Sequence, residues 1–190
     1  MLALDSHQVK YSVFAPNKPQ HHVVDHGAGE VTSETRNVLV ESARIARGNV
    51  ADLNSLDVDS FDGLVIPGGF GVAKNLCTFA FDGASASVDP VVESIIKSFN
   101  QQKKIITAMC IAPALIALCL NGVSLTIGTD EETAKTLESL GAKHIKTPSS
   151  EFVIDETNKV ISTAAYMHDN ASLDEIYNGI SGAIKASLKF

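Results

Sequence analysis

Cys110 is the residue of this chain whose position favours nucleophilic chemistry. It lies between an apolar run at 104–109 and an apolar helical pattern at 111–119. A strand that turns directly into a helix places its turn residue at the helix N-terminus, where free N–H groups and the helix dipole favour an anion. Because the thiolate is the reactive form of cysteine, this position predicts a nucleophile that attacks a carbonyl carbon. On position alone, simple burial of Cys110 stays an equal alternative.

A glycine turn is expected to lie beside this cysteine. The residues Gly68, Gly69, Phe70 and Gly71 follow the apolar run 63–66. In parallel α/β sheets, ligands bind beyond the carboxyl ends of the strands, and glycines let backbone N–H groups approach a ligand closely. We therefore predict that the N–H groups of Gly69 and Ile111 form an oxyanion hole. Paired glycines taken alone are usually only turns.

Five further side chains are weaker candidates for the site. Lys74 and Asn75 follow the glycine turn, where the lysine either helps to hold an anionic product or is solvated at a helix start. Asp130 either opens a helix or orients a water molecule. Phe70 and Tyr166 either line a pocket or pack in the core.

The pattern of elements predicts a doubly covered sheet. Extended segments are expected at 11–16, 21–25, 63–66, 104–109, 125–128, 152–154 and 159–161, and helices at 33–48, 88–100, 111–119, 129–141 and from 172 onward. Expected helix caps are Ser33, Asp89 with Pro90, a capping box from Thr129 to Glu132, and another from Ser172 to Glu175. Strands that alternate with helices indicate an α/β fold with a mostly parallel sheet, and we expect one domain over 1–190.

Composition excludes several functional classes. The 190 residues carry a formal charge of −7 without a dense basic block, which argues against a nucleic-acid or membrane partner. Three cysteines without C-x-x-C or zinc spacing indicate a reducing compartment, so we expect a cytoplasmic protein without a metal. His21, His22 and His26 lie close to Asp25, but exposed loop histidines are the favoured interpretation.

Several segments resemble one known family. They are "GLVIPGGFGVAKNL" at 63–76, "MCIAPAL" at 109–115, "SETRNVL" at 33–39, "LTIGTD" at 125–130 and "AAYM" at 164–167. Together they are similar to the ElbB-type proteins of the PfpI-like, class I glutamine-amidotransferase-like superfamily. The resemblance implies a flavodoxin-like three-layer sandwich with Cys110 on a nucleophile elbow. It also implies a cofactor-free glyoxalase activity that converts glyoxal to glycolate, and homodimers are frequent in the superfamily.

The chain departs from this superfamily in two ways. Members often pair the cysteine with a histidine after the next strand, but 127–130 has none, and His144 and His168 lie too far along the chain to be assumed equivalents. The first strand and its glutamate are also missing, so we expect an N-terminally truncated domain that lacks its first strand. Two alternatives therefore stay open: a non-catalytic binding or regulatory protein, and an amidotransferase subunit.

Overall fold

Four strands form the sheet that positions Cys110. In the computed structural model, which describes residues 1–190, these are β5 (Gly63–Ile66), β6 (Ile105–Met109), β10 (Val160–Thr163) and β9 (Phe152–Asp155), in the order β5-β6-β10-β9. The strands β5, β6 and β10 are parallel, and β9 runs antiparallel to β10. The α/β fold with a mostly parallel sheet is therefore confirmed, as is the hairpin expected at 152–161. The missing first strand stays a prediction.

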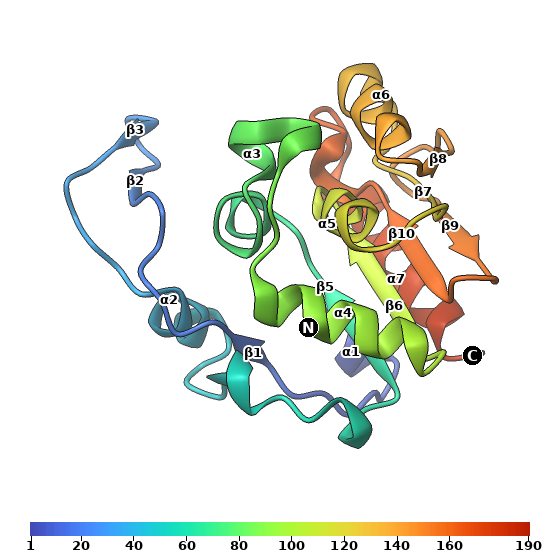
Figure 1. Ribbon diagram of the computed structural model, residues 1–190, viewed down its shortest axis with the longest axis horizontal. Helices are drawn as coiled ribbons and strands as arrows, with labels where there is room; N and C mark the ends of the chain where they lie inside the picture. The colour runs from blue at the N-terminus through green and yellow to red at the C-terminus, as the bar shows by residue number, and fades with distance from the viewer. The chain divides into compact units, whose positions relative to one another are not determined.

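Helices cover both faces of this sheet (Figure 1). The helices α4 (Pro90–Gln101) and α5 (Ala112–Cys119) contact β6, while α7 (Leu173–Ser187) contacts β6, β9 and β10. On the α7 side, Met109 packs with Ile184 and with Ala3 of the short helix α1 (Leu2–Ser6). The strands read as continuous apolar runs because side chains on both faces are buried.

The helix caps follow the sequence pattern at two of three expected places in this unit. The Asp89 carboxylate accepts from the N–H of Val91 at 3.0 Å and precedes Pro90, and the Ser172–Glu175 capping box forms both of its bonds. The capping box expected from Thr129 to Glu132 is wrong. Asp130 caps α6 (Glu131–Ser139) instead, because its carboxylate reaches the N–H of Thr133 at 2.7 Å.

The strands β7 (Ser124–Leu125) and β8 (Lys143–His144) form a parallel pair, and β7 contacts β9 and β10. The strand β7 stops before 126–128, because the N–H groups of these three residues donate to side chains, those of Ser162, His144 and Thr126, and not to a neighbouring strand. The short elements of this unit are η2 (Val58–Ser60), η3 (Val72–Leu76), α3 (Phe79–Asp82), η4 (Gly83–Ser85) and η5 (Ala165–Met167).

Residues Lys10–Asp57 form a second compact unit, and Met1–Val9 with Val58–Phe190 form the first. In the second unit, β1 (Phe14–Ala15) pairs in parallel with β4 (Ala51–Asp52), and β2 (Val24–Asp25) forms a hairpin with β3 (Glu30–Val31). The unit also contains α2 (Val38–Ile45) and η1 (Leu53–Ser55). Asn37, not Ser33, caps α2, because its side chain accepts from the N–H groups of Leu39 and Val40. The expectation of one domain stays a prediction.

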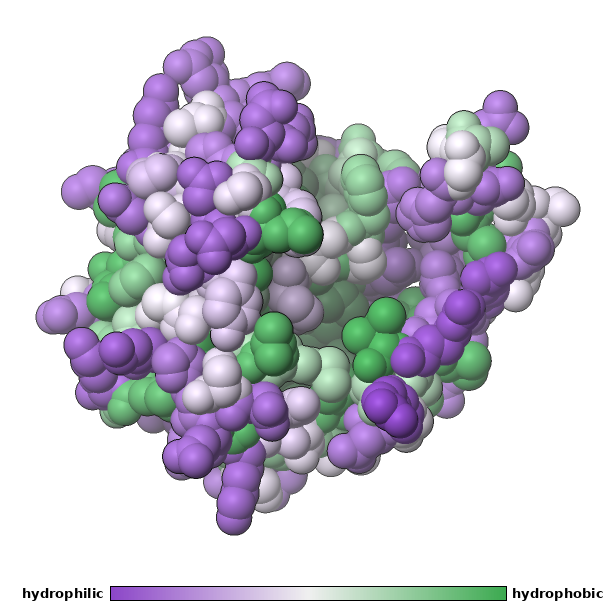
Figure 2. All heavy atoms as spheres, turned by 180° about the vertical axis from the view of Figure 1, so that it is seen from behind, coloured by the Kyte–Doolittle hydropathy of each residue, from purple (hydrophilic) through white to green (hydrophobic).

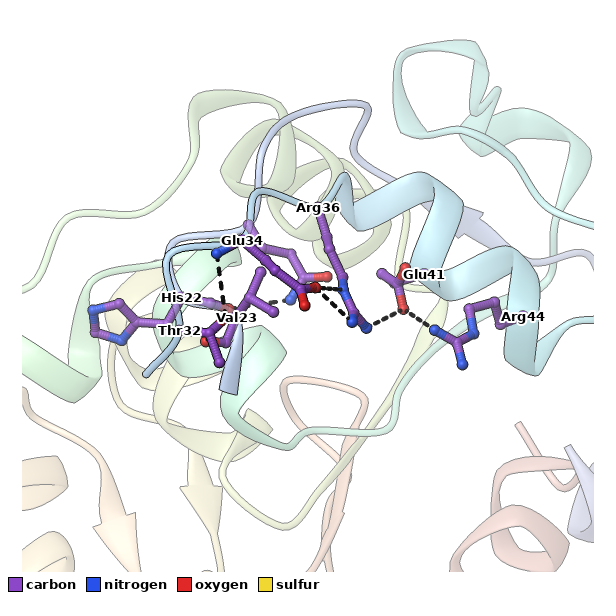
Figure 3. A network of polar contacts seen from close by, with 8 residues as sticks. His22, Val23, Thr32, Glu34, Arg36, Glu41 and Arg44 are labelled. Atoms are coloured by element: carbon purple, nitrogen blue, oxygen red, sulfur yellow. Dashed lines mark hydrogen bonds and ion pairs between the residues drawn. The ribbon is translucent and has the colours of Figure 1, made fainter. Parts of the chain in front are cut away.

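A chain of surface ion pairs joins residues just before α2 to residues within this helix (Figure 3). Arg36 donates to Glu34 at 2.8 Å and lies 3.7 Å from Glu41, which also accepts from Arg44 at 2.9 Å. Pairs of this kind on the surface contribute little stability, typically up to about 1 kcal/mol each. We therefore expect this network to stabilise the start of α2 only slightly.

The surface and the helix lengths give two further observations. On the face shown in Figure 2, polar and apolar residues are interspersed. None of the helices combines the length and the apolar character needed to cross a membrane.

Candidate active site at the Cys110 elbow

Cys110 occupies a sharp turn between β6 and α5. Its φ is 57°, a left-handed conformation that costs a residue with a side chain roughly 1–2 kcal/mol. Its N–H donates to the carbonyl oxygen of Thr163 on the neighbouring strand β10 at 3.0 Å, which holds the turn in place. The side chain is partly exposed, so the interpretation of Cys110 as one more fully buried core residue is not supported.

The helix α5, which follows Cys110, is buried along almost its whole length. Every residue of α5 except Leu118 is buried, from Ala112 to Cys119. The N–H of Ile111, just before the helix, has no hydrogen-bond partner within the chain. A rigid helix start with a free N–H group and a positive dipole end suits a developing anion.

The glycine turn lies directly against the cysteine. A Cβ atom built on Gly68 would lie 3.0 Å from the Cβ of Cys110 and would collide with the carbonyl oxygen of Met109. Gly68 and Gly69 both have positive φ, at 85° and 80°. The carbonyl of Gly69 accepts from Val72 and Ala73, while its own N–H is unpaired. The structure thus brings Gly68 and Cys110 together, as the sequence predicts; the oxyanion role of Gly69 and Ile111 stays a prediction.

The aromatic candidates are not core residues. Phe70 is 73% exposed and Tyr166 is 61% exposed, which contradicts core packing for both side chains. Gly68 and Phe70 follow β5, and Tyr166 follows β10, so the two rings come from the strands on either side of β6. The Nζ of Lys74 lies 4.7 Å from the Phe70 ring centroid, in cation–π contact. Asn75 and Lys74 are half-buried in η3, and Gly71 is exposed.

Asp130 belongs to a different hollow. It caps α6, as the interpretation of a helix start predicts, and it lines a pocket with His168 and Glu175 that Cys110 does not line. A role for Asp130 at the cysteine has no contact to support it.

His168 is the functional candidate that the sequence pattern missed. It follows β10, whose Thr163 is in register with Met109, so His168 and Cys110 lie beyond the same carboxyl edge of the sheet. Its Nε2 lies 2.9 Å from the carbonyl oxygen of Thr147. The signal available in the sequence was the expected hairpin, whose second strand leads to His168. The neighbour of that strand in the sheet could not be read from the pattern.

His144 has a structural role. Its Nε2 accepts from the N–H of Ile127 at 3.3 Å, and burial lowers the pKa of the imidazole. The other two cysteines are also structural: Cys77 and Cys119 are buried, and burial raises the pKa of both thiols, to about 12 for Cys119. No three His, Cys, Asp or Glu side chains gather in a way that could hold a metal ion.

Comparison with known proteins shows extended similarity. No protein-family model matches the chain. The human protein called glutamine amidotransferase-like class 1 domain-containing protein 3, mitochondrial, is 44% identical over 187 residues, which are 93% of this chain and 69% of that protein. The rat ES1 protein homolog, mitochondrial, is 43% identical over 93% of this chain and 70% of its own length.

A solved structure shares the whole fold. The isoprenoid biosynthesis protein with amidotransferase-like domain from Ehrlichia chaffeensis has a TM-score of 0.91 and 42% identity, over 100% of this chain and 87% of that one. These relatives support the amidotransferase-like resemblance and leave the narrower ElbB-type assignment unconfirmed. The expectation of a cytoplasmic location is wrong, because both curated relatives are named as mitochondrial proteins. Cysteine usage indicates a reducing environment and cannot distinguish one such compartment from another.

Proposed function

The chain belongs to the family of glutamine amidotransferase-like class 1 domain proteins, and from this premise we propose that it is a cofactor-independent glyoxalase. The observation that carries the proposal is the left-handed backbone of Cys110, held between a glycine turn and a helix start. A strained residue that a rigid scaffold maintains is a common property of active sites. Cys110 is partly exposed, so an aldehyde small enough to enter can approach it.

The reaction begins with addition of the Cys110 thiolate to one aldehyde carbon of glyoxal. The carbonyl π electrons move to oxygen, and the N–H groups of Gly69 and Ile111, both unpaired, stabilise that alkoxide. Protonation gives a hemithioacetal. The C–H proton of the former aldehyde then moves to the neighbouring carbon through an enediol, which leaves a thioester of glycolate. Water attacks the thioester, breaks the C–S bond and releases glycolate and the thiol.

The proton transfer needs a base at the carboxyl edge of the sheet. His168 comes from the strand beside β6, and the structure gives its Nδ1 no partner. Neutral imidazole is well matched to proton transfer near neutral pH. We assign His168 to this transfer as part of the same proposal.

The test follows glycolate formation from glyoxal by mass spectrometry. We expect Cys110→Ser to lower kcat/KM by at least about a hundredfold, because a hydroxyl is a far weaker nucleophile than a thiolate. Cys119→Ala is the matched control, since that cysteine is buried within α5 and should leave turnover unchanged. Turnover that survives intact in Cys110→Ser would overturn the covalent mechanism.

Glutamine hydrolysis is a second candidate. The location of His168 after β10 supports it, because β10 and β6 are parallel neighbours that end at the same edge of the sheet. Ammonia release from glutamine, measured with the same variants, distinguishes the two activities. Ammonia release without glycolate formation would favour the amidotransferase candidate over the glyoxalase.

The names of the curated relatives also support a mitochondrial location. Fractionation of cells that express the full-length protein, with detection by an antibody, tests this part of the proposal. Recovery outside the mitochondrial fraction would contradict it.

A further inference from the structure

A polar pocket separate from the elbow lies beside α6 and α7. Its volume is about 660 Å³, within the range of small-molecule sites. The residues that carry the argument come from three segments: Asp130 before α6, Ser149 after β8, and His168, Asp169 and Glu175 around the start of α7. Cys110 is not among the residues that line it.

Ser149 is a mostly buried residue whose side chain has no partner in this pocket. The residue is only 7% exposed, and its side chain makes no hydrogen bond within the chain. Because Ser149 lines the hollow, a bound molecule can supply the missing hydrogen bond.

His168 presents a second unpaired group to the pocket. A carbonyl oxygen only accepts hydrogen bonds, so the contact with Thr147 at 2.9 Å places a proton on Nε2, and in the neutral ring Nδ1 is then an acceptor. The ring is held against Gly128, where a Cβ atom would lie 2.7 Å from Nε2. The imidazole is therefore fixed in place and ready to accept from a ligand.

The charge of the pocket is negative. Three carboxylates line it, from Asp130, Asp169 and Glu175, and no lysine or arginine does. Asp130 and Glu175 cap their helices, and Asp169 has no partner. Two helix N-termini contribute only about half a positive charge each, which does not offset three carboxylates. The surplus of acceptors and negative charge suits a ligand rich in donors.

We propose that this pocket binds a small organic cation that carries an ammonium group. The ammonium would lie near Asp169 and the free oxygens of Asp130 and Glu175, and further N–H or O–H groups would meet Ser149 and the Nδ1 of His168. This site shares His168 with the proposed function, but Cys110 does not line it and ligand binding requires no turnover.

The test uses 1,5-diaminopentane as the probe and 1,5-pentanediol as its uncharged counterpart. Both are titrated into the ¹⁵N-labelled full chain, and backbone amide shifts and calorimetric heats are measured. The diamine should shift the amides of Ser149, Asp169 and Glu175 more strongly than the diol. We expect Asp169→Asn and Ser149→Ala each to weaken diamine binding about two- to fivefold.

Asp62→Asn is the matched control, because Asp62 is an exposed acid just before β5, at the amino edge of the sheet. It should bind the diamine as the wild type does, and circular dichroism verifies that every variant is folded. Three results would each overturn the proposal: no shifts at these amides, equal shifts with the diol, or equal weakening by Asp62→Asn and Asp169→Asn. None of them bears on glycolate formation, so this proposal and the proposed function fail separately.

Discussion

Gly68 lies so close to Cys110 that a Cβ atom on the glycine would be 3.0 Å from the Cβ of the cysteine and would collide with the carbonyl oxygen of Met109. Gly68→Ala should therefore push the glycine turn away from the elbow and strain a backbone with φ 85°. We expect the free energy of unfolding to fall by about 2 kcal/mol and glyoxal turnover to fall at least tenfold, by rough estimate. Urea unfolding and glycolate formation measure the two effects.

Gly71→Ala is the internal control for that substitution. Gly71 has φ −57°, and an added Cβ atom would meet nothing within 4 Å. Its stability should stay within about 0.5 kcal/mol of the wild type or rise slightly. If both alanine variants lose the same stability, close packing of Gly68 on the elbow is not the cause.

The left-handed backbone at Cys110 predicts an inverted order of stability for two substitutions. In a helix interior, glycine is about 1 kcal/mol less favourable than alanine. At φ 57° the Cβ atom is the penalty, so Cys110→Gly should be more stable than Cys110→Ala by about 1 kcal/mol. At Cys119, the last residue of α5, the backbone φ is not positive, so the ordinary order should return. Thermal unfolding of the alanine and glycine variants at Cys110 and Cys119 measures this order. If the alanine variant is more stable than the glycine variant at both positions, the turn at Cys110 is not strained.

Alkylation should distinguish the three cysteines. Cys77 is 4% exposed and Cys119 is 8% exposed, and burial raises the pKa of both thiols. Cys110 is partly exposed, so iodoacetamide should modify Cys110 alone in the folded protein and all three cysteines in urea. Peptide mapping by mass spectrometry identifies the sites. Equal labelling of Cys119 in the folded protein would show that α5 is not packed as described.

His144 should make stability depend on pH near neutrality. Burial lowers its pKa below the ordinary value of about 6.5. As the pH falls below that value, the unfolded chain takes up a proton that the folded chain resists, so the free energy of unfolding decreases. Between about pH 7.5 and 5.5, wild type should lose more stability than His144→Gln. Chemical unfolding at both pH values measures this, with the exposed His26→Gln expected to behave like the wild type.

Asp155 should contribute to stability through its hydrogen bonds. Burial alone would raise the pKa of this carboxyl, but bonds from Asn158 and from the N–H of Ser124 outweigh it and lower the pKa. The stabilisation is present above the ordinary pKa of about 3.9 and is lost as the pH falls through the folded value. Asp155→Asn should cost about 2–3 kcal/mol in urea unfolding at neutral pH. Glu156→Gln, its exposed neighbour, should cost much less; equal losses would contradict this role.

The sequence alone predicts several local features of the fold. Asp89 with Pro90, and the Ser172–Glu175 pair, predict their helix starts because each cap satisfies N–H groups within one turn of itself. The position of Cys110 between an apolar strand and an apolar helix predicts the elbow in the same way. The sequence pattern predicts Ser33 as the cap of α2, but Asn37 caps it, because several polar residues precede the helix and each could serve as the cap.

The sequence by itself determined the α/β class and predicted the glycine turn and the candidate nucleophile, because each depends on neighbours along the chain. Tertiary structure alone decided that β10 lies beside β6 and brings His168 to the carboxyl edge, and that Phe70 and Tyr166 are exposed. It also decided that Ser149, Asp169 and Glu175 share one pocket. The reason is physical: strand order and packing join residues far apart in sequence, and the hydrophobic pattern of one strand does not specify its partner.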